Sequence, residues 1–148
     1  MIAFDQPITA TTPAVHQQAV AVLVNRERGK RGLPAVRSSR LLRISARRWA
    51  LMQTRLSRFG HGNLDRRARG FPFVLRGGRV RWSVGENLAW GLRRDSTPRR
   101  IVRAWMGSPK HRAVLLGAWR YGAVISIPDA PMPGRQTSGV TVVQHFGR

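Results

Sequence analysis

The chain has 148 residues, of which 42% are hydrophobic, and this is enough for one globular domain with its own core. No apolar run approaches the roughly 20 residues that cross a bilayer, and the first residues lack the basic-then-apolar pattern of an export signal. If the protein is secreted, we therefore expect its signal to lie outside this sequence. The absence of cysteine excludes disulfides and thiolate metal ligands.

The formal charge of +21 comes from 27 cationic and six acidic residues, and 25 of the cations are arginine. Such a charge favours contact with polyanions, namely nucleic acid, anionic lipid headgroups or the acidic polymers of a cell envelope. The arginines are spread from Arg26 to Arg148 and form no single tract. A general compositional bias toward arginine would therefore explain the same charge without any dedicated binding site.

Two amphipathic helices are predicted in the first part of the chain. Thr12-Pro13 is typical of a helix start, with an N-cap followed by proline at the first helical position, and apolar residues then recur at helical spacing over 13–28. A second helix is predicted to begin at residue 38 or 39, to bury one apolar face and to end just before His61.

The middle of the chain is expected to contain one strand. Residues 62–78 are irregular and cationic, with a short helical turn at 65–69. Apolar and polar residues then alternate over 79–84, which is the period-2 pattern of a strand with one buried face. We expect this strand to place Glu86 at its end.

Two short helices are predicted next. Thr97-Pro98 and Ser108-Pro109 repeat the cap-plus-proline start, and the second helix extends to about Leu116. It places His111 in its first turn, where the positive end of the helix dipole disfavours an imidazolium and keeps the ring neutral.

The chain is predicted to end in a hairpin. Tyr121–Ile127 and Val140–Phe146 are apolar, β-branched runs separated by prolines and a glycine, which indicates two antiparallel strands joined by a long loop. Helices that flank a small, mostly antiparallel sheet predict an α+β sandwich. We interpret 14–148 as one domain and 1–13 as an N-terminal extension.

Two histidines and one carboxylate are the candidate functional residues: His61, Glu86 and His111. Neutral imidazole and carboxylate are ligand types that Zn²⁺ accepts, and two histidines with one glutamate would leave a position open for water or substrate. Each of the three is 25 residues from the next, so the spacing contains no local metal motif. Three separately satisfied polar residues are the alternative interpretation. Glu86, at the end of an apolar strand, must be exposed, paired or metal-bound.

Other polar and aromatic residues receive structural interpretations. His16, in the first helix, is interpreted as a surface or packing residue, and His145, on the last strand, is assigned no role. Ser108 is interpreted as a helix cap and not as a nucleophile. Three tryptophans fall on predicted core faces, whereas two others flank turns and stay open: Trp49, Trp82 and Trp105 belong to the first group, and Trp90 and Trp119 to the second.

Several motifs occur in a fixed order along the chain: Asn25-x-x-Arg28 with Gly32-Leu33, His61, Gly85-Glu86-Asn87-Leu88-Ala89-Trp90-Gly91, Trp105-Met106-x-Ser108-Pro109-x-His111-Arg112, and Gln144-x-Phe146-Gly147. In this order they resemble the CAP superfamily, the cysteine-rich secretory, antigen 5 and pathogenesis-related proteins, in its compact bacterial form, also called SCP-like extracellular proteins. The resemblance covers about 14–147. It implies a three-layer α-β-α sandwich with a small central, mostly antiparallel sheet and a surface cleft.

The resemblance also implies a site. The family's cleft commonly carries two histidines and two acidic residues, and in several members the histidines bind a divalent metal such as zinc. By motif position His61 and His111 match the histidines, and are the implied metal ligands, while Glu86 matches the first acid. Ser108 stands where the second acid is expected, which weakens a mechanism that uses paired carboxylates. The absence of cysteine and the strong basicity are two further departures from the family pattern.

The leading hypothesis is a secreted or cell-envelope-associated binding module that is a monomer. Its cleft of His61, Glu86 and His111 would hold a divalent metal or a small polar ligand, and its basic surface would attract an anionic envelope polymer or lipid. One alternative is a metal-dependent hydrolase, in which zinc lowers the pKa of bound water and Glu86 is the candidate base. Another is a nucleic-acid-binding protein, whose phosphate contacts would give a steep salt dependence without sequence preference.

Overall fold

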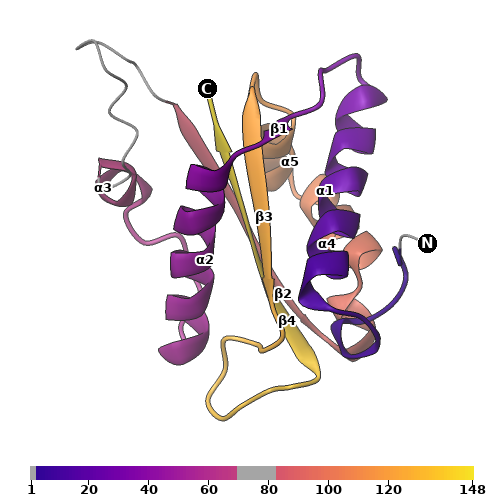
Figure 1. The fold of residues 1–148 in the computed structure, drawn as a ribbon, viewed down its shortest axis with the longest axis vertical. Coiled ribbons are helices and arrows are strands. Elements are labelled where there is room, and N and C mark those ends of the chain that lie inside the picture. The colour runs from indigo at the N-terminus through magenta and orange to yellow at the C-terminus, as the bar shows by residue number, and fades with distance from the viewer. Residues whose placement is uncertain (1–2, 70–82) are drawn as a thin grey trace.

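The computed structural model describes residues 3–69 and 83–148, and a four-stranded sheet forms the centre of this part of the chain (Figure 1). The spatial order is β1-β3-β4-β2. β1 pairs with β3 in parallel, and the other two pairs are antiparallel, so the predicted mostly antiparallel sheet is confirmed. The strands are β1 (Arg37–Ser38), β2 (Val84–Leu92), β3 (Tyr121–Ile127) and β4 (Gly139–Gly147).

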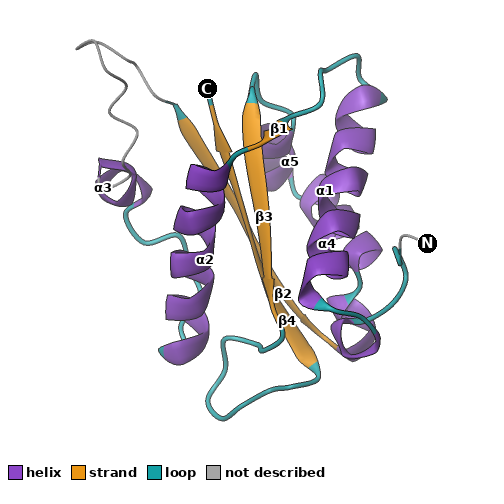
Figure 2. Ribbon diagram, viewed as in Figure 1, coloured by secondary structure: helices purple, strands orange, loops and turns teal. Residues whose placement is uncertain are grey.

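Helices cover both faces of this sheet, with α2 on one face and α1 and α4 on the other (Figure 2). The predicted α+β sandwich is therefore confirmed. None of the described helices combines the length and the apolar character that a membrane-spanning helix requires. The helical segments are η1 (Ile8–Ala10), α1 (Pro13–Gly29), α2 (Arg40–Arg55), α3 (Leu64–Arg69), η2 (Arg93–Ser96), α4 (Pro98–Gly107) and α5 (Pro109–Leu115).

The burial of β4 shows why the sheet is a middle layer. Every residue of this strand is buried, and alternate side chains face opposite layers. Val142 and Phe146 belong to the larger apolar cluster, which includes residues of α1 and α4, whereas Val143 packs with Ala46 and Ala50 of α2. The larger cluster also contains Ile8, which precedes α1.

The predicted helix starts are observed. The hydroxyls of Thr12, Ser39 and Thr97 accept hydrogen bonds from backbone N–H groups three residues later, at 3.2, 3.3 and 3.3 Å. Ser108 is also the N-cap residue, of α5, but its side chain makes no capping hydrogen bond. Its interpretation as a cap was therefore right for the position and wrong for the hydrogen bond.

The end of α2 differs from the prediction. The helix ends at Arg55, several residues before His61, because Ser57 adopts a left-handed backbone with φ of 48°. The following loop is held by side chains: Gly60 N–H donates to Gln53 Oε1 at 2.8 Å, and Ser57 Oγ donates to Met132 O at 2.9 Å. His61 therefore lies on an anchored loop and not at a helix end.

The position of the middle strand also differs. β2 runs from Val84 to Leu92, so Glu86 is its third residue and not a residue at its end. The expected strand residues 79–82 lie outside the described residues. Pairing explains the difference, because every residue of β2 has a partner on β4, up to Leu92 opposite Gly139. Pairing with β4 therefore extends the strand through the glycine-containing motif at 85–91, where the sequence itself has no clear period-2 pattern.

His16 in α1 is fully buried, and its contacts select one tautomer. Nε2 lies 2.7 Å from the backbone oxygen of Ser96, which can only accept, so Nε2 carries the proton. Nδ1 lies 2.8 Å from Ser126 Oγ and accepts from that hydroxyl. Of the two roles expected for His16, packing is the one observed.

We expect the free energy of unfolding to decrease as the pH is lowered from about 7.5 to values below 6.5. Burial lowers the pKa of His16 below its ordinary value of 6.5, against the opposing effect of the Ser96 carbonyl. Below about pH 6.5, His16 of the unfolded chain binds a proton, whereas buried His16 of the folded chain stays neutral. The stability that neutral His16 contributes is therefore lost as the pH falls through the folded pKa. Urea unfolding at several pH values measures this slope. His16→Gln, which does not titrate, should give a shallower slope; an unchanged slope would contradict the assignment.

Candidate functional site

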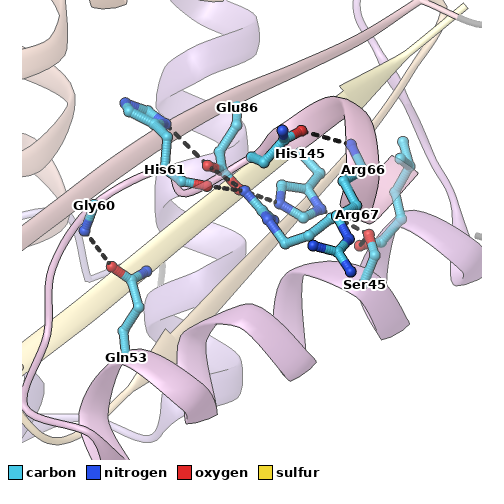
Figure 3. A network of polar contacts seen from close by, with 10 residues as sticks. Ser45, Gln53, Gly60, His61, Arg66, Arg67, Glu86 and His145 are labelled. Carbon is cyan, nitrogen blue, oxygen red and sulfur yellow. Dashed lines mark hydrogen bonds and ion pairs between the residues drawn. The ribbon is translucent and has the colours of Figure 1, made fainter. Parts of the chain in front are cut away.

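A buried carboxylate, Glu86 on β2, is the centre of the site. Arg67 Nη2 lies 2.8 Å from each of its oxygens, His61 Nδ1 lies 2.9 Å from Oε1, and His145 Nε2 lies 2.7 Å from Oε2 (Figure 3). An ionised carboxylate has about four acceptor positions. These four contacts therefore use the whole hydrogen-bonding capacity of Glu86.

Glu86 is ionised at neutral pH in spite of its burial. Burial by itself raises the pKa of this carboxyl group, because desolvation disfavours the charged form. The hydrogen bond and charge of His145 and the charge and hydrogen bond of Arg67 outweigh burial, and the pKa lies below its ordinary value of 4.5. The site is therefore a buried charge that is compensated by Arg67 and His145.

The loop after α2 positions His61. Gly62 has φ of +57°, and a Cβ at this position would lie 2.9 Å from the Trp49 ring, so only glycine allows the chain to turn this closely over the tryptophan. The side chain of His61 is 51% exposed. Because ionised Glu86 accepts the hydrogen bond from Nδ1, a neutral His61 ring carries its proton on Nδ1 and leaves Nε2 as a lone-pair donor.

Arg67 reaches Glu86 from the short helix α3. Asn63 begins this helix: its Oδ1 accepts from Arg66 N–H at 2.7 Å and its backbone oxygen accepts from Arg67 N–H at 3.1 Å. The Arg67 guanidinium lies 3.7 Å from the centre of the Trp49 ring and donates to the backbone oxygen of His61 at 2.6 Å. Arg67 thus neutralises Glu86 and holds the His61 loop at the same time.

His145 supports Glu86 from β4. Ser45 Oγ on α2 lies 2.6 Å from His145 Nδ1 and 2.9 Å from Leu42 O. His145 Nε2 donates to Oε2 of the ionised Glu86 at 2.7 Å, since this carboxylate can only accept. His145 therefore links α2 to Glu86 through both of its ring nitrogens.

His111 lies in the first turn of α5, as predicted. The side-chain amide of Asn87, the residue after Glu86, donates to the backbone oxygen of His111 at 3.1 Å and so ties α5 to β2. Burial lowers the pKa of His111, and the charge of His61 lowers it further. His111 is therefore neutral at pH 7.

The structure brings His61 into contact with Glu86, while no hydrogen bond joins the His111 side chain to either of them within 3–69 and 83–148. Over the same ranges, no group of three or more His, Cys, Asp or Glu side chains is arranged to hold a metal ion.

Sequence reasoning missed three members of the network, namely Arg67, His145 and Ser45. His145 was assigned no role, yet in the sheet it lies directly opposite Glu86. The alternation of Gln144, His145 and Phe146 already places His145 on the opposite face from its neighbours. Only the register between β2 and β4, however, reveals that Glu86 is its partner.

Comparison of the structure with solved structures finds proteins of the same fold, whereas comparison of the sequence finds no relative. No protein-family description matches the chain. No curated protein sequence matches it either. An outer surface protein from Borrelia burgdorferi superposes with a TM-score of 0.68 at 17% identity, covering 88% of this chain and 90% of that protein.

Two longer proteins contain the same fold. An extracellular protein with an SCP domain from Bacillus anthracis has a TM-score of 0.66 at 19% identity, over 93% of this chain and 44% of that one. A cysteine-rich secretory protein from Staphylococcus aureus has a TM-score of 0.66 at 14% identity, over 92% of this chain and 39% of that one. This chain therefore spans less than half of these two proteins. Together with the ordered motifs, the likeness shows that the chain has the fold of the CAP superfamily, the SCP domain.

Proposed function

We propose that this chain is an extracellular or cell-envelope binding module whose ligand site is formed by His61 and His111. The observation that carries the proposal is the 2.9 Å hydrogen bond from His61 Nδ1 to Glu86 Oε1. A buried, ionised carboxylate on one ring nitrogen fixes the tautomer and orientation of a histidine and raises the basicity of the other nitrogen. The location is inferred from the three proteins of the same fold, which are described as outer-surface, extracellular and secretory.

The donor set fits a weakly held divalent metal such as zinc. His61 would contribute Nε2, and His111 a neutral imidazole, because burial and the nearby His61 lower its pKa. Two imidazoles are fewer than the three protein ligands usual in catalytic zinc sites, so water or a small polar ligand would complete the coordination. When bound, the metal would supply Lewis-acid polarisation of that ligand.

Glu86 is proposed as the group that orients His61, and not as a general base. A general base must direct a free lone pair at the proton that it removes. The four contacts from Arg67, His61 and His145 use the acceptor positions of Glu86, and its side chain is fully buried. This arrangement supports a binding module over a hydrolase that depends on Glu86.

We expect His61→Ala combined with His111→Ala to abolish zinc binding without loss of the fold, because both proposed ligands are removed and neither side chain belongs to the apolar core. Isothermal titration calorimetry with zinc measures the affinity, and circular dichroism checks the fold. Lys110→Ala, an exposed neighbour of His111, is the matched control and should leave the affinity unchanged. Zinc affinity that persists in the double variant would place the metal elsewhere and overturn the proposal.

The charge of the chain supports a partner that is an anionic envelope polymer. A formal charge of +21 attracts polyanions and accelerates their encounter with the protein. Attraction of this kind acts over the whole surface, so by itself it assigns no binding site. A binding site for such a polymer therefore has to follow from how the cations are distributed over the described surface.

A further inference from the structure

A groove of about 480 Å³ is lined by residues of the C-terminal half of α1, of α4 and of α5. Its apolar lining consists of Leu23, Val102 and Met106. Six cations and one carboxylate complete the lining, which gives the groove a formal charge of +5: Arg26, Lys30, Arg31, Arg99, Arg103 and Arg112, with Glu27.

Three of these cations already have a carboxylate partner. Glu27 accepts from Lys30 at 2.7 Å and from Arg31 at 2.9 Å, and the pairs are exposed. Arg99 forms a bidentate pair with Asp5 at 2.6 and 2.9 Å. These pairs keep part of the rim in place without neutralising the groove.

The other three cations, Arg26, Arg103 and Arg112, form no ion pair with a carboxylate in the part of the chain that the structure describes, and all three are exposed. Arg26 lies over the ring of Phe4 at 4.6 Å, and Arg112 donates a long hydrogen bond of 3.5 Å to Met106 O. These weak contacts leave the guanidinium groups free to bind an anion bidentately.

The spacing of the cations suits an extended chain of anionic groups. Arg26 of α1 and Lys30, the residue that caps this helix, are four residues apart, as are Arg99 and Arg103 on α4. Four helical residues correspond to about 6 Å along the helix axis. Cations spaced along both helices that line the groove suit a linear polyanion. The apolar lining can contact the uncharged carbon segments between its anionic groups.

Single-stranded nucleic acid is less well matched to this groove. Proteins that bind single strands stack the bases on aromatic side chains. No aromatic residue is among the described residues that line the groove. The chemistry of the lining therefore favours a polymer without bases.

We propose that this groove binds a linear polyol-phosphate polymer, a phosphodiester chain without bases. The proposal rests on the proposed function insofar as the partner is an anionic envelope polymer, and it is independent of the His61 and His111 site. Arg26, Arg103 and Arg112 contact the phosphates, and the apolar lining contacts the polyol carbons.

The test compares two variants of equal charge. One removes the unpaired groove cations by Arg26→Gln, Arg103→Gln and Arg112→Gln; the other removes three exposed arginines of α2, on the opposite face of the sheet, by Arg40→Gln, Arg47→Gln and Arg55→Gln. Each variant loses three charges from +21 and so carries +18. The probe is a fluorescent poly(glycerol phosphate) of defined length, titrated at fixed salt concentration because phosphate contacts are strongly screened.

We expect the groove variant to lose about tenfold or more in affinity and the α2 variant to lose about threefold or less. Equal losses would overturn the groove while leaving an anionic partner in place. An absence of binding by the unaltered chain would overturn the anionic partner itself and leave the zinc test unaffected. Tighter binding to an oligothymidylate of equal charge, or to vesicles of anionic phospholipid, would also overturn the proposal. If the triple variant does not fold, Arg103→Gln alone against Arg47→Gln alone decides between the same outcomes.

Discussion

Glu86→Gln is expected to lower the free energy of unfolding by about 3–5 kcal/mol. The change removes the anion but keeps its shape, so the partly buried Arg67 guanidinium loses its counter-charge and the buried His145 loses its charged acceptor. The amide also replaces one acceptor oxygen with a donor nitrogen, which faces one of these donors. Removing one partner of a buried charge network is costly because the remaining charges stay desolvated. Urea unfolding at pH 7 measures the loss.

Glu27→Gln is the matched control for this experiment. Glu27 also contacts two cations, Lys30 and Arg31, but at the surface, so its removal should change stability by about 1 kcal/mol or less.

A second measurement is the dependence of the free energy of unfolding on pH in the acid range. The pKa of Glu86 lies below 4.5, so its stabilisation is present above about pH 4.5 and is lost as the pH falls through the folded pKa. Similar losses in the two variants would show that the Glu86 network is not a major source of stability.

The second large effect is expected for Arg28→Lys, at about 2–4 kcal/mol of lost stability. Arg28 is fully buried, and burial lowers its pKa. Its Nε donates to Pro34 O at 3.1 Å, and Nη1 donates to Leu115 O at 2.8 Å and Gly117 O at 2.9 Å, with Trp119 O at 3.5 Å from Nη2. The fork of the guanidinium thus joins the end of α1 to the end of α5 and the turn before β3.

Lysine keeps the charge but concentrates its donors on one atom, so it cannot reach carbonyls on both sides of the fork. Each buried carbonyl left without a donor costs about 1–3 kcal/mol. Arg26→Lys, two residues earlier on the same helix and exposed, is the control and should change stability by about 0.5 kcal/mol or less. Chemical denaturation of both variants in parallel measures the difference. Equal stability of Arg28→Lys and the unaltered chain would mean that the four carbonyls do not depend on the guanidinium.

Much of the fold could be predicted from the sequence because its signals are local. Thr12 and Thr97 precede prolines, and their hydroxyls cap the following helices as expected. The two β-branched runs near the C-terminus form β3 and β4 and pair with each other. Such features depend on neighbouring residues only, so they can be recognised without knowledge of the tertiary arrangement.

The motifs also indicated two members of the site that are in contact, His61 and Glu86, and the resemblance to the CAP superfamily implies a role in a cleft for both. It also named His111, which lies in the first turn of α5, where its backbone oxygen accepts from Asn87 of β2. The sequence alone supplied no reason for their proximity, since each is 25 residues from the next.

The tertiary structure decided what Glu86 does. Its partners come from three separate elements, with Arg67 on α3, His145 on β4 and His61 on the loop between α2 and α3. The contact with His145 follows from the register that sets Glu86 opposite it, and a shift of one residue would turn that side chain to the other face of the sheet. Sequence patterns thus determined most of the helices and the strands β3 and β4, while the resemblance singled out His61, Glu86 and His111 as candidates. The pairing of distant strands decided which charges meet, because the free energy of a buried carboxylate depends on donors that arrive from elsewhere in the chain.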